Sequence, residues 1–148
     1  MSSLPSIRNG FITYGCLTNI QRINDSVLSV WASILHRTPF SRLLIKDKTA
    51  GDSVIRDKIL GSISSQGIDT DRIEFQYRTD RLGHLSTYQD IDIALSPFPY
   101  GGGTSILEAS WMGVPSVVYS GSTFQSRVAE SIYKVLGSSQ VAQTFLNN

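Results

Sequence analysis

Short apolar runs alternate with segments of helical periodicity along almost the whole chain, and this alternation constrains the fold more than any other feature. Five runs rich in β-branched and aromatic residues predict strands at 11–16, 42–45, 73–77, 91–95 and 116–119. Each run is followed by apolar residues that recur every three or four positions, which predicts helices around 27–34, 54–63, 82–88, 106–112 and 124–134. The chain therefore reads as five consecutive β-α units.

Repeated β-α units favour a parallel sheet, because strands that run in the same direction need a crossover connection and a helix supplies it. We therefore predict an α/β fold, a three-layer, Rossmann-like parallel sheet with helices on both faces. The lobe is expected to occupy 11–137, with 1–10 as a disordered segment or linker and 138–148 as a truncated C-terminal tail. Sheets of this class bind ligands in a crevice at the carboxyl ends of the strands.

Composition excludes several kinds of protein. The 13 Lys and Arg residues nearly balance 12 Asp and Glu residues, for a formal charge of +1, whereas proteins that bind nucleic acid by bulk electrostatics are strongly basic. Cys16 is the only cysteine, so neither a disulfide framework nor a cysteine-based zinc site can form within the chain. No stretch is long and apolar enough to span a bilayer, and the first residues lack the features of a secretory signal. We expect a cytoplasmic protein with neither nucleic acid nor membrane as a partner.

A glycine-rich run at 97–109 leads from the fourth predicted strand into the fourth predicted helix. Three successive glycines allow the backbone to approach a ligand closely and to adopt positive φ, and the free N–H groups of the first helical turn favour an anion. Glu108, about one turn into the helix, is placed to reach a ribose hydroxyl. The alternative is a purely structural loop in which Thr104 or Ser105 is an ordinary N-cap.

Basic residues gather after the predicted strands, where the crevice should lie. They are Arg22 after the first strand, Lys46 and Lys48 at the end of the second, Arg78 and Arg81 after the third, and Arg127 after the fifth. Each one taken singly could be an ordinary solvated side chain, but their shared location suits a polyanion such as a diphosphate.

Two acidic pairs raise the question of a metal, because paired carboxylates are common ligands of divalent cations. Asp69 and Asp71 precede the third predicted strand, and Asp90 and Asp92 precede the fourth. Both pairs should therefore lie at the edge of the sheet opposite the crevice, as solvated loop carboxylates. We expect no metal site and no cofactor.

Six strings in the chain stand out as a set. They are LTNIQRIN at 17–24, DIAL at 92–95, PFPY at 97–100, GGGTS at 101–105, WMGVP at 111–115 and the segment 121–129. Together they resemble the C-terminal catalytic lobe of the O-linked N-acetylglucosamine transferases and of the related SPINDLY and bacterial glycosyltransferases. The resemblance covers roughly 14–137, and the order of the last three strings is far more specific than a glycine motif alone. It implies the C-terminal lobe of a GT-B glycosyltransferase.

The resemblance assigns roles to residues before the glycine run. Arg22 matches a position where a cation meets the diphosphate of the donor, and Asn19 matches a neighbouring polar position. Arg81 matches a second basic residue of the nucleotide site, and His84 matches a histidine beside the uridine. A lone helical histidine is otherwise more often structural.

The glycine run carries the remaining nucleotide-binding assignments. Thr104 and Ser105 match two hydroxyl residues that bind the diphosphate, Glu108 matches an acidic residue that binds the ribose, and Gly102 and Gly103 belong to the same loop. Gly103 stands where the animal enzymes have histidine, and Ser105 stands where they have threonine. Loss of that imidazole leaves the backbone anion site intact but changes the surroundings of the sugar.

The resemblance implies the UDP-sugar-binding lobe, with UDP-N-acetylglucosamine as the expected donor, of a metal-independent, inverting protein O-glycosyltransferase. It assigns no catalytic residue to this lobe, because the family's acid-base groups lie in a first lobe, which usually follows a tetratricopeptide-repeat region that presents the protein acceptor. The chain is then a fragment that is inactive alone. A non-catalytic interaction or regulatory domain and a lobe of a nucleotide-sugar epimerase are the alternatives. The G-x-G-x-x-G pattern expected of a nicotinamide site and the Gly-Lys-Ser/Thr of a P-loop are both missing.

Overall fold

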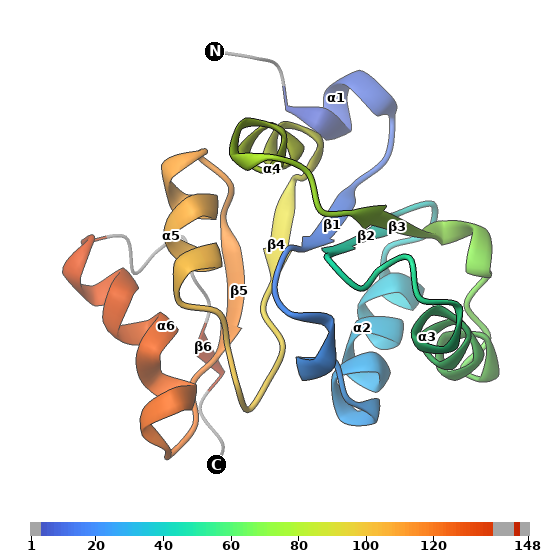
Figure 1. Cartoon of the computed structure of the whole chain (residues 1–148). Coiled ribbons are helices and arrows are strands. Elements are labelled where there is room, and N and C mark those ends of the chain that lie inside the picture. The colour runs from blue at the N-terminus through green and yellow to red at the C-terminus, as the bar shows by residue number, and fades with distance from the viewer. Residues whose placement is uncertain (1–3, 138–143, 146–148) are drawn as a thin grey trace.

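The structure, a computed structural model, describes residues 4–137 and 144–145 and has a parallel sheet at its centre (Figure 1). The strands are β1 (Thr13–Cys16), β2 (Arg42–Asp47), β3 (Ile73–Tyr77), β4 (Ile93–Leu95), β5 (Ser116–Tyr119) and the two-residue β6 (Thr144–Phe145). Their order in the sheet is β3-β2-β1-β4-β5-β6, and all neighbouring strands run parallel. The predicted α/β, Rossmann-like fold is confirmed. The chain reverses its direction of progress across the sheet between β1 and β4, which is where ligands bind in such folds.

The helices connect the strands in the predicted alternation. They are α1 (Pro5–Asn9), α2 (Asp25–Arg37), α3 (Ser53–Ser65), α4 (Arg81–Ser86), α5 (Thr104–Trp111) and α6 (Phe124–Val135), with short 3-10 segments η1 (Ile20–Arg22), η2 (Thr70–Arg72) and η3 (Thr87–Asp90). Local capping sets several of their starts, since side chains of Asn24, Asp52 and Thr123 accept backbone N–H groups at the beginnings of α2, α3 and α6. The third predicted helix is divided into α4 and η3.

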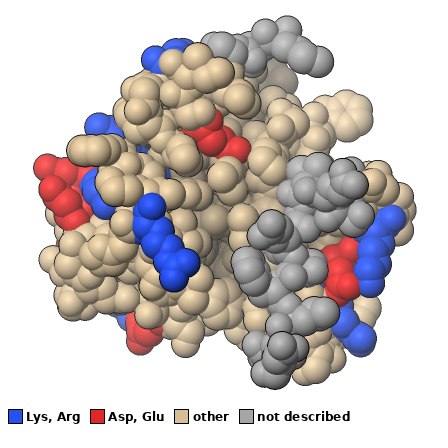
Figure 2. Space-filling view, turned by 180° about the vertical axis from the view of Figure 1, so that it is seen from behind, with Lys and Arg blue, Asp and Glu red and all other residues tan. Residues whose placement is uncertain are grey.

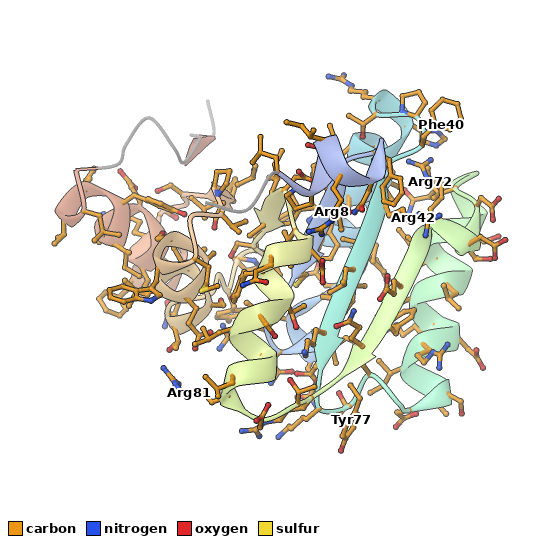
Figure 3. The ribbon with its side chains drawn as sticks, turned by 90° about the horizontal axis from the view of Figure 1, so that it is seen from above. Arg8, Phe40, Arg42, Arg72, Tyr77 and Arg81 are labelled. Atoms are coloured by element: carbon orange, nitrogen blue, oxygen red, sulfur yellow. The ribbon has the colours of Figure 1, made fainter. Side chains whose placement is uncertain are left out.

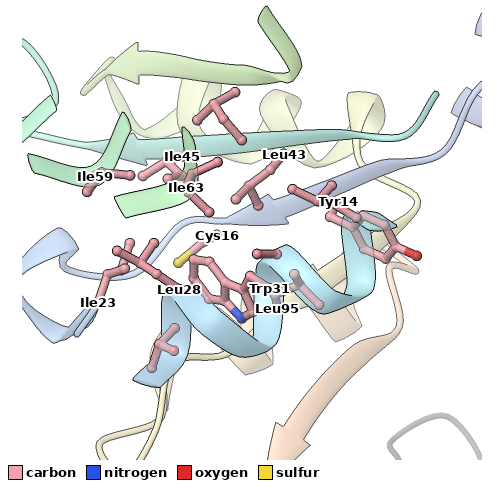
Figure 4. Close-up of a cluster of buried hydrophobic side chains, with 14 of the residues drawn as sticks. Tyr14, Cys16, Ile23, Leu28, Trp31, Leu43, Ile45, Ile59, Ile63 and Leu95 are labelled. Atoms are coloured by element: carbon pink, nitrogen blue, oxygen red, sulfur yellow. The ribbon is translucent and has the colours of Figure 1, made fainter. Parts of the chain in front are cut away.

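One face of the sheet packs against α2 and α3 in the larger hydrophobic cluster (Figure 4). Leu28 and Trp31 come from α2 and Ile63 from α3, and they meet Leu43 and Ile45 of β2. The exposed fraction of each of these five side chains is 2% or less, so this half of the molecule has a dry core. The packing of this core holds β1 and β2 in place, and with them the loops that follow these two strands.

The opposite face packs against η3 and α5. Tyr88, Ile91 and Ala109 form a second buried cluster with Leu44 of β2. Gly15 of β1 faces Ile91, and a Cβ at Gly15 would lie 2.3 Å from Ile91 Cδ1, so only glycine permits this close approach. The helix α6 adds a third cluster with α5 and β5.

The N-terminal segment is a correction to the expected linker or disordered segment at 1–10. Pro5 stands at the start of α1 and Gly10 ends the helix with φ of 77°, which suits a proline start and a left-handed glycine stop. The carboxylate of Asp92 accepts from Ser6 N at 2.8 Å and from Thr13 N at 2.9 Å. β1 begins at Thr13, where its pairing with Arg42 of β2 begins, rather than at residue 11, and β4 begins at Ile93.

The expected C-terminal tail, 138–148, lies outside the described residues except for 144–145, which add β6 to the edge of the sheet. Among the described residues, no helix has the length and apolar character that crossing a membrane requires. The face seen in Figure 2 carries Lys and Arg side chains interspersed with Asp and Glu rather than one extended patch of a single sign. This pattern agrees with the small formal charge of +1.

Candidate functional site

Loops at the carboxyl ends of β1, β2 and β3 enclose a cavity of about 370 Å³. Four of the predicted site residues line it, namely Asn19, Arg81, His84 and Glu108. Figure 3 shows Arg81 and Tyr77 at this edge of the sheet, far from Arg8 and Arg42 at the other edge. The sheet thus brings together residues from the loop after β1, from α4 and from α5 that are distant in the sequence.

Arg81, His84 and Glu108 form a polar cluster at the side of the cavity between α4 and α5. His84 Nε2 lies 3.1 Å from Glu108 Oε2, and Arg81 Nη1 lies 4.0 Å from Glu108 Oε1. The side chain of Glu108 is 16% exposed, whereas that of Arg81 is 80% exposed. Glu108 is therefore a partly buried acceptor, and Arg81 is an exposed cation at the rim of the cavity.

The glycine run provides backbone donors beside this cavity. Ser96 Oγ accepts from Gly102 N at 3.0 Å, and Gly103 is the N-cap of α5 with no side-chain cap hydrogen bond. Within 4–137 and 144–145, the N–H groups of Gly103, Thr104 and Ser105 have no hydrogen-bond acceptor. Free N–H groups at the positive end of a helix form an anion site.

Two details of the glycine run differ from the sequence expectations. None of the glycines at 101–103 has positive φ, so none of them forms a left-handed turn. A glycine is required in this run only where neighbouring atoms leave no space for a side chain. A Cβ at Gly102 would lie 2.1 Å from Ser105 Oγ and 2.9 Å from Thr18 Cγ2, whereas one at Gly103 would come no nearer than 3.7 Å, to Val128 Cγ1. Thr104 and Ser105 also lie in the first turn of α5 instead of capping it.

Tyr88 forms a hydrogen bond with the first turn of α5. Its hydroxyl donates to the Ser105 carbonyl at 3.1 Å, and the ring is 2% exposed. Burial, with a smaller contribution from the charge of Glu108, raises the pKa of Tyr88 well above its usual range, so the phenol stays a donor.

Thr104 lines an adjoining hollow of about 520 Å³ that shares Arg81 and Glu108 with the first cavity.

Asn19 and Arg22 shape the loop that follows β1. Asn19 caps η1 by accepting from Gln21 N at 2.9 Å. Arg22 does not line the cavity. Its Nη1 donates to the Gly101 carbonyl at 2.9 Å, and Asn24 Nδ2 donates to the Phe98 carbonyl at 3.0 Å. Asn24 caps α2 with its side-chain oxygen, and its amide nitrogen also holds the glycine run in place.

Apart from Arg22, which bonds to the glycine run, the basic residues expected at the crevice divide into three groups. Lys48, Arg78 and Arg81 are exposed and line the cavity. Lys46 also reaches the cavity wall but is only 4% exposed, because its ammonium is enclosed by α4. Arg127 lies apart, in a groove between α5 and α6. The expected shared location therefore includes Lys48, Arg78 and Arg81 but not Arg22 or Arg127, and the binding of an anion there stays a prediction.

The acidic pairs lie before β3 and β4, as predicted, and three of the four carboxylates have hydrogen-bond or ion-pair partners, Asp92 accepting from Ser6 N and Thr13 N. Asp69 caps η2 and Asp90 lies 2.8 Å from Arg8 Nη2. Across the described parts of the chain, no three His, Cys, Asp or Glu residues gather as ligands for a metal ion.

Comparison with known proteins adds the family. The profile of glycosyl transferase family 41 matches residues 4–146. The chain belongs to glycosyl transferase family 41. This result agrees with the resemblance noted in the sequence, and it covers both the glycine run and the loops around the cavity.

Individual family 41 relatives include plant proteins named probable UDP-N-acetylglucosamine–peptide N-acetylglucosaminyltransferase SPINDLY. The Petunia hybrida protein is 36% identical over 138 residues, which is 93% of this chain and 15% of the relative. The Oryza sativa subsp. japonica protein is 37% identical over 134 residues, which is 90% of this chain and 14% of the relative. The chain thus spans about a seventh of the length of these curated relatives.

A solved structure extends the family 41 match to three dimensions. A mutant O-GlcNAc transferase from Thermobaculum terrenum superposes with a TM-score of 0.87 at 33% identity, covering 91% of this chain and 26% of that one. The fold described above is therefore that of one lobe within a larger O-GlcNAc transferase-like glycosyltransferase.

Proposed function

We propose that this chain is the nucleotide-sugar-binding lobe of a protein O-glycosyltransferase, and that its donor is a UDP-sugar, with UDP-N-acetylglucosamine first among them. The observation that carries the proposal is the cavity lined by Arg81, His84 and Glu108. The adjoining hollow shares Arg81 and Glu108 with it and is also lined by Thr104, at the uncapped start of α5. A nucleoside diphosphate needs cations and N–H donors for its phosphates and an acceptor for its ribose hydroxyls, and this site offers both. The names of the plant relatives support the choice of donor.

Transfer of a sugar leaves negative charge on the departing diphosphate. The N–H groups of Gly103, Thr104 and Ser105 and the positive end of α5 would stabilise that charge without reorganisation. Arg81 would add a charge-assisted hydrogen bond, typically about 1.5–3 kcal/mol. We propose that this set of donors acts without a metal and that the reaction inverts the anomeric centre.

The groups that activate the acceptor hydroxyl are proposed to lie outside this chain, in a first lobe that faces the cavity, with a protein as acceptor. Glu108 would accept from the ribose rather than act as a base, since its carboxylate is already held by His84 and Arg81. Alone, the lobe should bind nucleotide weakly and transfer no sugar. A cytoplasmic location stays a prediction.

Calorimetric titration of the chain with UDP, in parallel with GDP and NAD, tests the proposal. We expect selective UDP binding that weakens roughly tenfold in Arg81→Ala. Arg37→Ala, at the exposed end of α2, is the matched control and should bind like the wild type. Tighter binding of GDP would overturn the choice of base, and a folded chain that binds no nucleotide would favour an interaction or regulatory domain.

The epimerase alternative needs a larger protein for its test. The product of the complete enzyme distinguishes the two reactions. Glycosylated peptide supports a transferase, whereas a free sugar or an epimerised donor supports an epimerase.

A further inference from the structure

Lys46 is a buried cation at the end of β2 whose three donors are all used inside the protein. Its Nζ donates to Thr79 Oγ1 at 3.0 Å, to Thr87 Oγ1 at 2.6 Å and to the Gly83 carbonyl at 3.3 Å. An ammonium group has three N–H bonds, so none is left for a ligand. Lys46 therefore differs from Arg81, which has donors free at the rim of the same cavity.

The three acceptors surround the part of α4 that carries the site. Thr79 precedes the helix, Gly83 lies within it and Thr87 follows it. Arg81 and His84 lie between these acceptors in the chain. One ammonium group on the rigid sheet thus fixes both ends of the short helix from which these two side chains reach the cavity.

The packing around this ammonium is close. A Cβ at Gly83 would lie 2.8 Å from Asp80 Oδ1 and 2.9 Å from Thr79 Oγ1, so the first turn of α4 has no room for a side chain there. Asp80 Oδ1 accepts from Gly83 N at 2.9 Å and caps the helix. The lysine, the cap and the glycine together define one position for α4.

The charge of Lys46 has no carboxylate within ion-pair distance among the described residues. Burial lowers the pKa of its ammonium, and the charge of the more distant Asp80 partly opposes this effect. A buried cation without an ion-pair partner destabilises the free protein. An anion bound in the cavity above would supply the missing negative charge.

We propose that Lys46 is a positioning residue of the nucleotide site, which holds α4 against β2 so that Arg81 and His84 face the cavity and which places a fixed positive charge beneath the ligand without touching it. This inference rests on the function proposed above. It adds a residue that acts through α4 rather than by direct contact.

Hydrogen exchange of the α4 amides in the absence of nucleotide tests the positioning role independently of any ligand. Lys46→Met keeps the length of the side chain and removes the donors and the charge. We expect exchange at residues 81–87 to become roughly tenfold faster or more, while the amides of α2 and α3 keep their protection. Lys58→Met is the matched control, because Lys58 is exposed on α3 and does not line the cavity.

A second variant keeps the test valid if Lys46→Met does not fold. Thr79→Val removes one acceptor at an exposed position and should loosen α4 in the same direction by a smaller factor. Unchanged α4 exchange in Thr79→Val, together with unchanged exchange in a folded Lys46→Met, would overturn the positioning role.

UDP titration of the same variants tests the role toward the ligand. We expect roughly tenfold weaker UDP binding in Lys46→Met and wild-type affinity in Lys58→Met. A loosened α4 with unchanged UDP affinity would overturn the proposal. A wild-type protein that binds no UDP, but in which Lys46→Met still loosens α4, would overturn the nucleotide function and leave the role in holding α4 established.

Discussion

His84 Nε2 and Glu108 Oε2 lie 3.1 Å apart and join α4 to α5 across the mouth of the cavity. The two residues are 24 positions apart in the chain, and β4 with its glycine run lies between them. The contact fixes the Glu108 carboxylate before any ligand arrives, so little ordering is left for binding to supply. It also means that a ligand hydroxyl must share this carboxylate with the imidazole.

Glu108→Gln should weaken UDP binding roughly tenfold, because a charge-assisted hydrogen bond to a ribose hydroxyl would become a neutral one. The amide keeps the size of the side chain, so the fold should be unaffected. Calorimetric titration measures the change. Glu74→Gln, an exposed change on β3, is the control and should leave the affinity as it is. Equal affinities in the two variants would exclude Glu108 from the nucleotide site.

Gly102→Ala and Gly103→Ala should differ sharply although the residues are adjacent. The new Cβ at Gly102 would collide with Ser105 Oγ and Thr18 Cγ2, while that at Gly103 would make an ordinary contact with Val128. We expect Gly102→Ala to lower the free energy of unfolding by about 1–3 kcal/mol and Gly103→Ala to change it by less than about 0.5 kcal/mol. Urea denaturation measures both values. Similar losses in the two variants would show that the loop is not packed as described.

The sequence predicts the order and type of the elements well, because within each β-α unit the local residue pattern agrees with the strand or helix that forms. Ile73–Tyr77 and Ser116–Tyr119 form strands at the predicted residues, since both are short β-rich runs. The sequence misses the extent of β2, which continues to Asp47 because Lys46 and Asp47 pair with Gln76 and Tyr77. It also misses α1, which has too few apolar residues to show a period.

The sequence predicts the candidate site only in part. Strand order places the loops together, and the family resemblance assigns Arg81, His84 and Glu108 to the nucleotide site. Neither reveals that Lys46 is enclosed rather than exposed, because its burial depends on acceptors 33 to 41 residues away in the chain. Long-range packing of this kind leaves no period or spacing in the sequence.

Asp92→Ala should release α1 and lower stability, whereas Asp90→Ala should not. The Asp92 carboxylate accepts two backbone N–H groups, those of Ser6 and Thr13, and a hydrogen bond to a charged group is worth about 1.5–3 kcal/mol. Asp90 forms an ion pair with Arg8 in which its side chain is 60% exposed, and such pairs contribute about 0–1 kcal/mol.

Urea denaturation, together with hydrogen exchange of residues 6–10, measures the effect of the two aspartate variants. A loss in Asp90→Ala as large as that in Asp92→Ala would indicate that the ion pair, not the carboxylate of Asp92, holds α1 to the sheet.

Glu130 should make the stability of the α6 region depend on pH. Its carboxylate pairs with Lys134 Nζ at 2.5 Å and also accepts from Ser120 Oγ after β5. The hydrogen bond from Lys134 and then that from Ser120 lower the pKa of Glu130 below the ordinary value of 4.5. A lowered pKa in the folded state stabilises the protein above the unfolded pKa, and this stabilisation is lost as the pH falls through the folded pKa.

We therefore expect Glu130→Gln to be less stable than the wild type by a constant amount well above the ordinary pKa of 4.5, with the difference shrinking as the pH falls below that value. Urea denaturation at a series of pH values measures this convergence. Lys134→Met should destabilise the wild type but have little further effect in the Glu130→Gln background, because the pair is already broken. A difference between wild type and Glu130→Gln that does not shrink as the pH falls below 4.5 would mean that the variant acts through packing, because a charged pair with a lowered pKa must lose its contribution as the carboxylate is protonated.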